Sequence, residues 1–377
     1  MLRILLTGGG SGGHLYPLIA VAEELQKQSA QSGVNLELQF IGADGFVRET
    51  AATIGIATKS IFSPKWRRYF SYHNFIDILE APFGFLQAFF YIWRFMPDLV
   101  FSKGGYDSFI PALVARILAI PVVIHESDIV PGKANLWVSK WAKKIFLAFD
   151  GAKNYFKQDL VEVVGNPIRI GVANLTDKAA ALAAFNLNPS KPAVLITGAN
   201  QGAQTINEVL LLSLVELIKK FQLIHQSGPQ NYDDTNTRVL TIVKEGGGTY
   251  GKTIADNYRL YPVFDLKQMA LAYSAVDVIV GRSGAGTIFE IAAVGKPAII
   301  IPLKGAASDH QLANAREFAK FGAVVIEEEN LTPHILVNEI ENAYESRVER
   351  SERIKQFARP SAAPIIAEEV LGMIQQS

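Results

Sequence analysis

Residues Ile4–Gly13 read ILLTGGGSGG, and residues Val194–Ala203 read VLITGANQGA. Each stretch is an apolar run followed by a cluster of small residues, which predicts a buried strand, a tight turn and the first turn of a helix. The chain has 377 residues, enough for two domains that each bury a core. The repeated pattern therefore predicts two domains that begin in the same way.

Strand-like apolar runs alternate with amphipathic helical segments through most of the chain. This alternation is typical of a parallel sheet covered by helices on both faces, so the predicted fold class is α/β. Two Rossmann-like, doubly wound domains that face each other across a cleft are the expected architecture. The predicted strands are residues 3–7, 36–41, 98–102, 121–125, 144–148, 193–197, 221–226, 277–281, 298–302 and 323–326.

The predicted boundary between the two domains lies near residue 166. Residues 1–166 form the first expected domain, and residues 167–357 form the second. A stretch with less regular patterning, residues 165–191, joins them. The last segment, residues 358–377, contains a further predicted helix that can pack back on the first domain or stay with the second.

Composition excludes several classes of function. Lysine and arginine together number 36, as do aspartate and glutamate, so no net positive charge favours nucleic acid as a partner. The absence of cysteine excludes disulfides, thiolate zinc sites and cysteine nucleophiles. No cluster of carboxylates has the spacing of a metal site, so we expect neither a metal nor a cofactor.

Targeting signals are also missing from the sequence. The N-terminus lacks the basic region, long apolar region and cleavage site of a signal peptide, so the mature protein is expected to start at Met1. The longest apolar stretch without charge, residues 81–93, is too short to span a bilayer. A cytosolic protein is the expectation.

A histidine directly follows the first glycine cluster. Gly8–Gly13 satisfies the pattern G-x-G-x-x-G, which also occurs where a strand simply packs tightly against a helix. If the cluster is functional, the N–H groups at the start of the helix bind an anion or a polar sugar group. His14 then lies at the helix entrance, where the positive end of the helix favours the neutral imidazole that a general base needs.

A second cluster of small residues opens a helix in the second half. Gly281–Thr287 follows a predicted strand, an arrangement that suits phosphate. Glu290 lies about two turns into the helix, where a carboxylate can accept hydrogen bonds from both hydroxyls of a ribose. The alternative is an ordinary solvated helix residue. Further polar residues follow other predicted strands, namely Gly104–Tyr106, His125–Asp128 and Asp309–Gln311 with Asn314.

Seven motifs occur in order along nearly the whole chain. They are Gly8–His14, Gly104–Tyr106, His125–Glu126, Gly165–Arg169, Gln201–Ala203, Arg282–Ala285 with Glu290, and His310–Gln311 with Asn314–Ala315. Taken together, they resemble the UDP-N-acetylglucosamine transferases of peptidoglycan synthesis, which are inverting glycosyltransferases of family 28 with the GT-B fold.

The resemblance implies a reaction, its substrates and a location. N-acetylglucosamine would move from UDP-GlcNAc to the 4-hydroxyl of an undecaprenyl-linked MurNAc-pentapeptide in a single in-line displacement, without metal or cofactor. The enzyme would be peripheral to the cytoplasmic face of the bacterial inner membrane, with an anionic membrane surface and a cell-wall synthesis complex as expected partners.

By the same resemblance, His14, Tyr106 and Glu126 are the expected catalytic residues, and Asn135 lies on the acceptor side. Glu126 and Asp128 are the alternatives to His14 as general base. The residues expected to bind the donor are Ser11, Gly12, Gly13, Asp128, Arg169, Asn200, Phe264, Ser283, Gly284, Ala285, Gly286, Thr287, Glu290 and Gln311.

Within the donor set, the resemblance implies distinct roles. Glu290 and Gln311 resemble the ligands of the ribose and the donor sugar, Arg169 and Ser283 resemble groups near the diphosphate, and the chain around Phe264 resembles the uracil contact.

Three positions depart from the family pattern. Asp128 stands where asparagine is usual, Asn200 stands where serine is frequent, and Phe289 stands where a small polar residue is common. These departures concern substrate preference more than reaction type, because the glycine loops and His14 are all present.

Residues 62–96 are crowded with aromatic side chains, and basic residues accompany them. Part of this stretch is expected to be core. One helix cannot bury aromatic residues on every face, however, and an excess of them beside cations is typical of a surface that lies in the membrane interface. Trp66, Phe70 and Phe75 are the residues expected to contact the membrane.

Four other functions are compatible with parts of the sequence. A UDP-sugar-dependent glycolipid transferase would share the donor and differ in the lipid acceptor, whereas a UDP-GlcNAc 2-epimerase would need no acceptor. An NAD-dependent oxidoreductase would need an acidic residue about 20 residues beyond the glycines, and Asp44 lies too far along the chain. A non-enzymatic protein that binds sugar or lipid would have no functional role for His14.

Overall fold

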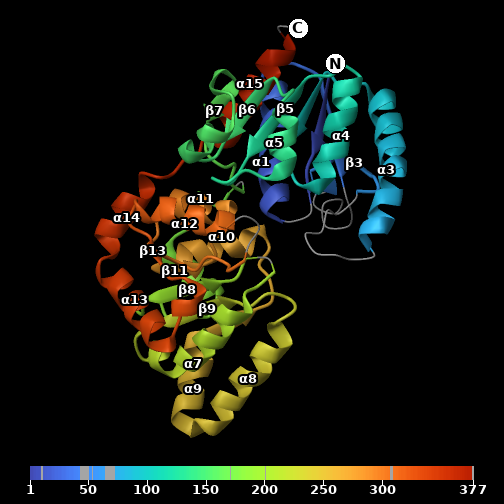
Figure 1. Ribbon diagram of the computed structural model, residues 1–377. Helices are drawn as coiled ribbons and strands as arrows, with labels where there is room; N and C mark the ends of the chain where they lie inside the picture. The colour runs from blue at the N-terminus through green and yellow to red at the C-terminus, as the bar shows by residue number, and fades with distance from the viewer. Residues whose placement is uncertain are drawn as a thin grey trace. The chain divides into compact units, whose positions relative to one another are not determined.

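The computed structural model describes residues 1–9, 12–42, 51–52, 54–63, 73–169, 171–199, 201–305 and 309–375, without the side chains of residues 12, 73–80, 248 and 249. The chain forms two compact units (Figure 1). Unit 1 comprises Met1–Arg169 and Pro360–Ser377, and unit 2 comprises Ile170–Arg359. The chain therefore builds unit 2 as one continuous segment and then returns to unit 1.

Unit 1 contains a parallel sheet in the strand order β3-β2-β1-β4-β5-β6-β7. Its strands are β1 (Leu2–Thr7), β2 (Leu36–Gly42), β3 (Ala57–Ser60), β4 (Leu99–Ser102), β5 (Val122–Glu126), β6 (Lys144–Leu147) and β7 (Val161–Val163). Its helices are α1 (Gly12–Gln31), α3 (His73–Phe95), α4 (Tyr106–Ile117), α5 (Lys133–Val138) and α15 (Ala362–Gln375), with 3-10 turns at Asp150–Tyr155 and Gln158–Leu160.

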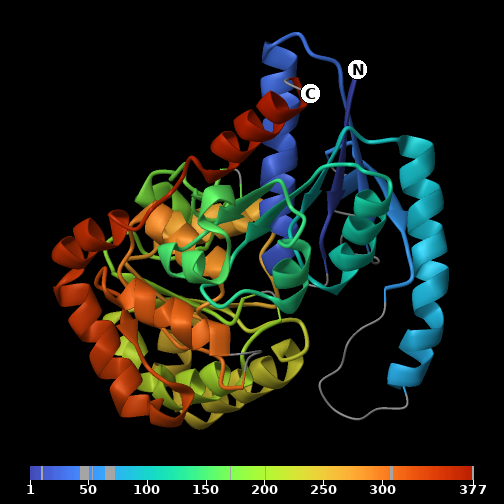
Figure 2. The same cartoon turned by 45° about the horizontal axis from the view of Figure 1, so that its top comes forward.

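Helices cover both faces of this sheet. Side chains alternate between the faces of a strand, so Ile4 and Leu6 of β1 pack beneath α1 and α15, while Leu5 packs on the side of α3 and α4. Figure 2 shows α15 lying along α1, and the two helices are in contact. The last helix of the chain therefore completes the core of unit 1.

Unit 2 contains a second parallel sheet, in the order β10-β9-β8-β11-β12-β13. Its strands are β8 (Ala193–Thr197), β9 (Gln222–Gln226), β10 (Tyr258–Tyr261), β11 (Val278–Gly281), β12 (Ala298–Ile300) and β13 (Val324–Val325). Its helices are α6 (Lys178–Ala184), α7 (Gln204–Lys220), α8 (Tyr232–Glu245), α9 (Gly247–Asn257), α10 (Leu266–Ala275), α11 (Ala285–Val294), α12 (His310–Ala319), α13 (Pro333–Glu345) and α14 (Arg347–Lys355), with a 3-10 turn at Glu328–Asn330.

Each sheet reverses its strand order at one point. In unit 1 the reversal lies between β1 and β4, and in unit 2 it lies between β8 and β11. Connections leave such a point toward opposite faces of the sheet, which opens a crevice at the carboxyl ends of the two strands where ligands of open α/β sheets bind. The glycine loops after β1 and β8 both begin at these points.

The predicted α/β fold class is confirmed, and each of the ten predicted strands is present. The sequence did not predict β3, β7 and β10, which lie at or next to the edges of the two sheets. The structure thus has the predicted sheets with additional strands at their margins.

Candidate functional site

The two glycine loops of unit 1 pack directly on each other at the ends of β1 and β4. A Cβ atom on Gly8 would lie 2.8 Å from the Cβ of Lys103. A Cβ atom on Gly105, where φ is 88°, would lie 2.8 Å from the carbonyl oxygen of Gly9. Real Cβ atoms do not make contacts this short, so glycine is the residue that fits at both positions.

This contact predicts the effect of Gly105→Ala on stability. Gly33 serves as the matched control, because its φ is also positive, at 67°, but an added Cβ would meet nothing within 4 Å. Gly33→Ala adds only the strain of a left-handed alanine, about 1 kcal/mol. Gly105→Ala should lose about 1–3 kcal/mol more, because it also overpacks the loop. Thermal unfolding of both variants measures the difference, and equal losses would contradict the tight packing.

His14 and Tyr106 lie at the starts of the two helices that follow these loops. His14 is the third residue of α1 and is partly exposed, while Tyr106 is the first residue of α4 and is 53% exposed. Gly12 and Gly13 form the first positions of α1. Ser11 lies outside the described residues. The structure thus places the expected catalytic histidine and tyrosine at the reversal point of unit 1.

Glu126 ends β5, and both of its carboxylate oxygens accept hydrogen bonds. Oε1 accepts from the N–H of Asp128 at 3.0 Å, and Oε2 accepts from the N–H of Gly132 at 3.0 Å and from Nδ2 of Asn135 at 2.9 Å. Burial, together with the charge of Asp128, raises the pKa of Glu126. The carboxylate anchors the loop that follows β5, so its surroundings favour a positioning role over direct catalysis.

Asn135, expected on the acceptor side, is buried in α5. Its Nδ2 also donates to the carbonyl oxygen of His125 at 3.2 Å. A Cβ atom on Gly104 would lie 2.7 Å from the same nitrogen. The side chain of Asn135 therefore packs against the Gly104–Gly105 loop.

Lys103 is a component of this site that the sequence did not single out. Its ammonium is buried and donates to Oγ of Ser127, which donates in turn to Oδ1 of Asn166 at 2.7 Å. Burial lowers the pKa of Lys103 to about 8, while the charges of Glu126 and Asp128 oppose this shift. The available signal was a lysine at the end of an apolar strand, directly before two glycines.

Arg169 lies at the end of the first segment of unit 1. Its guanidinium lies over the ring of Tyr16 in α1, 5.0 Å from the ring centroid, and the residue is 8% exposed. The preceding chain is held by His125, whose Nε2 donates to the carbonyl oxygen of Gly165 at 2.9 Å. Burial, reinforced by the charge of Lys103, holds the pKa of His125 well below its usual value.

In unit 2, the start of α11 offers N–H donors with open space before them. The helix is capped by Gly284, which supplies no side-chain acceptor, so the N–H groups of Ala285, Gly286 and Thr287 have no capping side chain. A Cβ atom on Gly284 or Gly286 would meet nothing within 4 Å. Such a helix start suits the oxygens of a phosphate group.

Glu290 follows this helix start on α11 and is 5% exposed. Its Oε2 accepts a hydrogen bond from the hydroxyl of Tyr273 at 3.0 Å, and Tyr273 itself is buried in α10. A helical side chain leans toward the N-terminus of its helix, which directs Glu290 over the turn that contains Gly286. Glu290 is therefore a confined carboxylate, which excludes the solvated helix residue considered from the sequence.

Gln311 and Ser283 are joined by hydrogen bonds beside the same helix start. Oε1 of Gln311 accepts from the N–H of Leu303 at 3.0 Å and from the hydroxyl of Ser283 at 3.4 Å. Nδ2 of Asn314 donates to the carbonyl oxygen of Ser283 at 3.3 Å. The oxygen of Gln311 is thus occupied, and its amide NH₂ is the group that can donate to a sugar hydroxyl.

Arg282 forms an ion pair that the sequence did not reveal. Its Nη2 lies 2.5 Å from Oε1 of Glu328, and its Nη1 donates to the carbonyl oxygen of Ile301 at 3.2 Å. Burial alone would raise the pKa of Glu328, but the N–H of Lys304 and the guanidinium of Arg282 hold it below its usual value. Arg282 therefore stabilises the loop after β11.

Among the described residues, no group of acidic, histidine or cysteine side chains could hold a metal ion.

Phe264, expected near uracil, is buried at 2% exposure. Its ring packs against Phe185 and Tyr261, with centroids 6.2 Å and 4.9 Å away. The ring therefore belongs to the core of unit 2 and is not exposed for stacking on a base. Asn200 lies outside the described residues.

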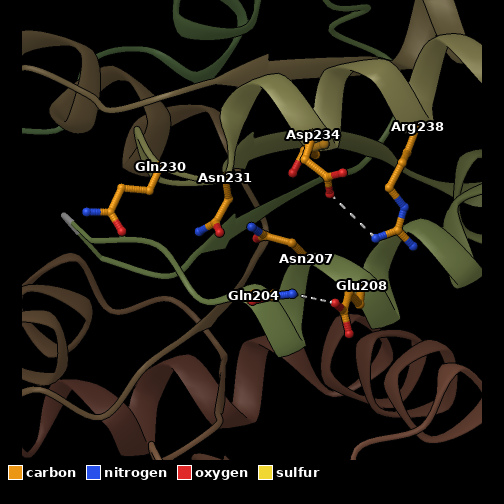
Figure 3. A pocket seen from close by; sticks show the side chains of 8 residues that line it. Gln204, Asn207, Glu208, Gln230, Asn231, Asp234 and Arg238 are labelled. Carbon is orange, nitrogen blue, oxygen red and sulfur yellow. Dashed lines mark hydrogen bonds and ion pairs between the residues drawn. The ribbon is translucent and has the colours of Figure 1, made fainter.

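A polar pocket of about 120 Å³ lies at the starts of α7 and α8 (Figure 3). Nε2 of Gln204 donates to Oε1 of Glu208 at 2.9 Å, and Nη1 of Arg238 lies 3.8 Å from Oδ2 of Asp234. Both contacts are drawn as dashed lines in Figure 3. Ligand pockets for nucleotide-sized molecules are several times larger. None of the residues expected at the site lines this pocket.

One face of α3 exposes an apolar stripe. Phe83, Leu86, Phe90 and Trp93 follow one another at intervals of three or four residues and are 63%, 63%, 54% and 57% exposed. No helix of the described residues has the length and hydropathy to cross a bilayer. Trp66, Phe70 and the side chain of Phe75 lie outside the described residues.

Both halves of the chain match domains of one known protein family. Residues 4–147 match the glycosyltransferase family 28 N-terminal domain, and residues 193–369 match the family 28 C-terminal domain. A curated relative from Treponema denticola is 34% identical over 96% of this chain and 94% of its own length. Its name is UDP-N-acetylglucosamine–N-acetylmuramyl-(pentapeptide) pyrophosphoryl-undecaprenol N-acetylglucosamine transferase.

Solved structures show the same relationship. The crystal structure of MurG from Acinetobacter baumannii aligns with a TM-score of 0.73 at 26% identity and covers 100% of both chains. A UDP-GlcNAc 2-epimerase from Neisseria meningitidis aligns with a TM-score of 0.64 at 17% identity, over 99% of this chain and 100% of its own. At that identity, the second likeness shows the fold alone.

Proposed function

Because this chain belongs to glycosyltransferase family 28, we propose that it transfers N-acetylglucosamine from UDP-GlcNAc to the 4-hydroxyl of an undecaprenyl-linked MurNAc-pentapeptide. The observation that carries the proposal is the likeness to relatives named for this reaction, which extends over nearly the full length of the chain. The enzyme is a hexosyltransferase of peptidoglycan precursor synthesis.

In this proposal, unit 2 binds the donor. The N–H groups at the start of α11 face the diphosphate, where they stabilise the charge that develops as UDP leaves, and the hydroxyl of Ser283 donates to Gln311 beside them. Glu290, held by Tyr273, accepts hydrogen bonds from the ribose hydroxyls. The amide NH₂ of Gln311 donates to a hydroxyl of the sugar.

Unit 1 presents the acceptor in the same proposal. His14 takes the proton from the 4-hydroxyl as its oxygen attacks the anomeric carbon of the donor sugar. The bond between that carbon and the diphosphate breaks, UDP leaves from the opposite face, and the configuration inverts. Tyr106 lies on the exposed start of α4, where it can contact the acceptor, and Arg169 adds positive charge for the diphosphate.

The test is a transfer assay with labelled UDP-GlcNAc and a short-chain lipid-linked muramyl-pentapeptide. A labelled disaccharide on the lipid supports the proposal. Transfer to diacylglycerol instead would support the glycolipid transferase, and conversion of the donor without any acceptor would support the epimerase. Either of these outcomes, without the disaccharide, would overturn the proposal.

The enzyme would work at the cytoplasmic face of the plasma membrane, attached by unit 1. The apolar stripe of α3 supports this placement, because four large side chains exposed on one helix face suit the interface of a bilayer. On α5, which packs against α4, Trp137 is also 57% exposed, and Nζ of Lys140 lies 4.7 Å from its ring centroid. An amphipathic ring beside a cation is typical of contact with anionic lipid headgroups.

Replacing Phe83, Phe90 and Trp93 together by serine should release the protein from anionic vesicles, with at least about tenfold less bound, since each ring contributes buried apolar area at the interface. Turnover of a water-soluble acceptor analogue should stay near the wild-type value. The control is the pair Leu212→Ser and Leu240→Ser in unit 2, where both side chains are also exposed. Vesicle sedimentation compares them, and equal binding by both variants would contradict the assignment of the surface.

A further inference from the structure

The guanidinium of Arg169 lies over an aromatic ring to which the proposed chemistry assigns no role. Its central carbon, Cζ, is 5.0 Å from the ring centroid of Tyr16 in α1, and the arginine is 8% exposed. A cation within about 6 Å of a ring centroid is attracted to the face of the ring, and the attraction is stronger where water is excluded. The ring of Tyr16 therefore limits the positions that this buried guanidinium can take.

The backbone that leads to Arg169 is held by separate contacts. The carbonyl oxygen of Gly165 accepts a hydrogen bond from Nε2 of His125 at 2.9 Å. Oδ1 of Asn166 accepts a hydrogen bond from the hydroxyl of Ser127 at 2.7 Å. Both donors are buried at the carboxyl end of β5. Because this backbone is held, the remaining freedom of the guanidinium lies mainly in the arginine side chain itself.

An arginine that is already held in place binds an anion more tightly than a flexible one. Its side chain has several rotatable bonds, and fixing them costs conformational entropy. Where the protein has fixed them beforehand, binding avoids that loss. Stacking on a ring uses the face of the guanidinium, whereas the N–H groups that bind phosphate oxygens lie in its plane. Arg169 can therefore stay on the ring of Tyr16 and bind a diphosphate at the same time.

We propose that Tyr16 is a positioning residue, whose ring holds the guanidinium of Arg169 in the orientation that binds the diphosphate of the donor. The inference rests on the proposed function, in which Arg169 adds positive charge for that diphosphate. Tyr16 lies two residues after His14 on α1, and residues at this spacing do not share a helix face. The ring thus acts on the diphosphate through Arg169 and not on the proposed base.

A double-mutant cycle on the full-length protein, with UDP as the ligand, tests the inference. The variants are Tyr16→Leu, Arg169→Ala and the two combined. Tyr16→Phe keeps the ring and removes only the hydroxyl. Tyr155→Leu is the matched control, because it removes a tyrosine of the same unit that is 49% exposed. Isothermal titration gives the Kd for UDP of every variant, and thermal unfolding gives its Tm.

We expect Tyr16→Leu to raise the Kd for UDP about three- to tenfold, while Tyr16→Phe and Tyr155→Leu stay within about twofold of the wild type. Arg169→Ala should raise the Kd about tenfold or more. In the double variant, Tyr16→Leu should add almost nothing to the effect of Arg169→Ala, because the ring acts through the guanidinium. Independent effects would overturn the inference. So would a Tyr16→Leu effect no larger than that of Tyr16→Phe or Tyr155→Leu.

The rate of transfer provides a second readout. Tyr16→Leu should keep the rise of the rate with pH that is proposed to come from His14. Loss of that rise would show that the ring acts on the base instead, and it would overturn the inference. If Tyr16→Leu does not fold, Tyr16→Met takes its place in the cycle with the same expected results. Failure of both variants to fold would assign the ring to the core and would also overturn the inference.

Binding of UDP separates this inference from the proposed function, because it needs neither an acceptor nor transfer. A protein that binds UDP and makes no disaccharide overturns the proposed function, while a non-additive cycle on the Kd would still support the role of Tyr16. A protein that makes the disaccharide, with independent effects of Tyr16→Leu and Arg169→Ala, overturns only the inference.

Discussion

His14→Ala is expected to lower the turnover number about 10²–10⁴-fold, the usual contribution of a positioned general base. His14 lies at the start of α1, directly after the glycine loop that packs on Gly105, so the substitution removes the proposed base without touching the groups of unit 2 that are proposed to bind the donor. The affinity for UDP-GlcNAc should therefore stay near the wild-type value. A histidine that only shaped the loop would alter the stability of unit 1 as well.

The pH dependence of the rate distinguishes these roles. The imidazole has to be neutral to accept a proton, so the wild-type rate should rise with pH as the base loses its own proton. His14→Ala should lose this rise, and His334→Ala, at an exposed histidine of unit 2, should keep it. If His14→Ala retains both its activity and the rise, the base lies elsewhere. Asp128 would be the next candidate, because Glu126 is occupied by three donors.

Glu290→Ala is expected to weaken donor binding by about 1.5–3 kcal/mol, which is roughly 10- to 150-fold in Kd. The carboxylate is confined beside the open start of α11, so ribose hydroxyls that lose water on binding would lose a charged partner in the variant. Gln311→Ala should weaken binding somewhat less, because it removes a neutral donor. Isothermal titration with UDP-GlcNAc measures both.

A conservative variant separates binding from structure at this position. Tyr273→Phe leaves the Glu290 carboxylate in place and removes only the hydroxyl that orients it, so its effect on Kd should be smaller than that of Glu290→Ala. Unchanged affinity in a folded Glu290→Ala variant would remove Glu290 from the donor site. A Tyr273→Phe effect as large as that of Glu290→Ala would indicate that packing, not the ribose contact, is responsible.

The sequence predicted the central strands well because they are buried on both faces. β8 and β11 are buried at every position, and such strands have nearly continuous apolar sequences. The strands that were not predicted lack this signature. β3 is ATKS and mostly exposed, and β7 has three half-buried residues, so neither shows an apolar run. Their pairing comes from the backbone of a neighbouring strand, which a local pattern does not reveal.

The surroundings of the side chains explain why the roles of some site residues could not be assigned from the sequence. An aromatic residue such as Phe264 suits a base-stacking role or a core position equally well, and its contacts with Phe185 and Tyr261 are what place it in the core. The role of Arg282 depends on its ion-pair partner, Glu328, which lies 46 residues further along the chain, so the glycine-rich motif alone does not reveal it. For the membrane surface, the spacing of Phe83, Leu86 and Phe90 was visible, but the sequence did not tell which face of the helix the core would cover.

The sequence by itself determined the α/β class, two domains that begin alike, and the glycine loops at which the chemistry is proposed. These features depend on local signals, because strand length, small-residue turns and helix starts are determined by residues that follow one another in the chain. Only the tertiary structure decided that Lys103 is buried, that Glu126 is occupied by its own loop, and that Glu290 is confined by Tyr273. Burial and hydrogen bonding join residues far apart in the chain, and the resulting loss of water sets which polar groups stay available to a substrate.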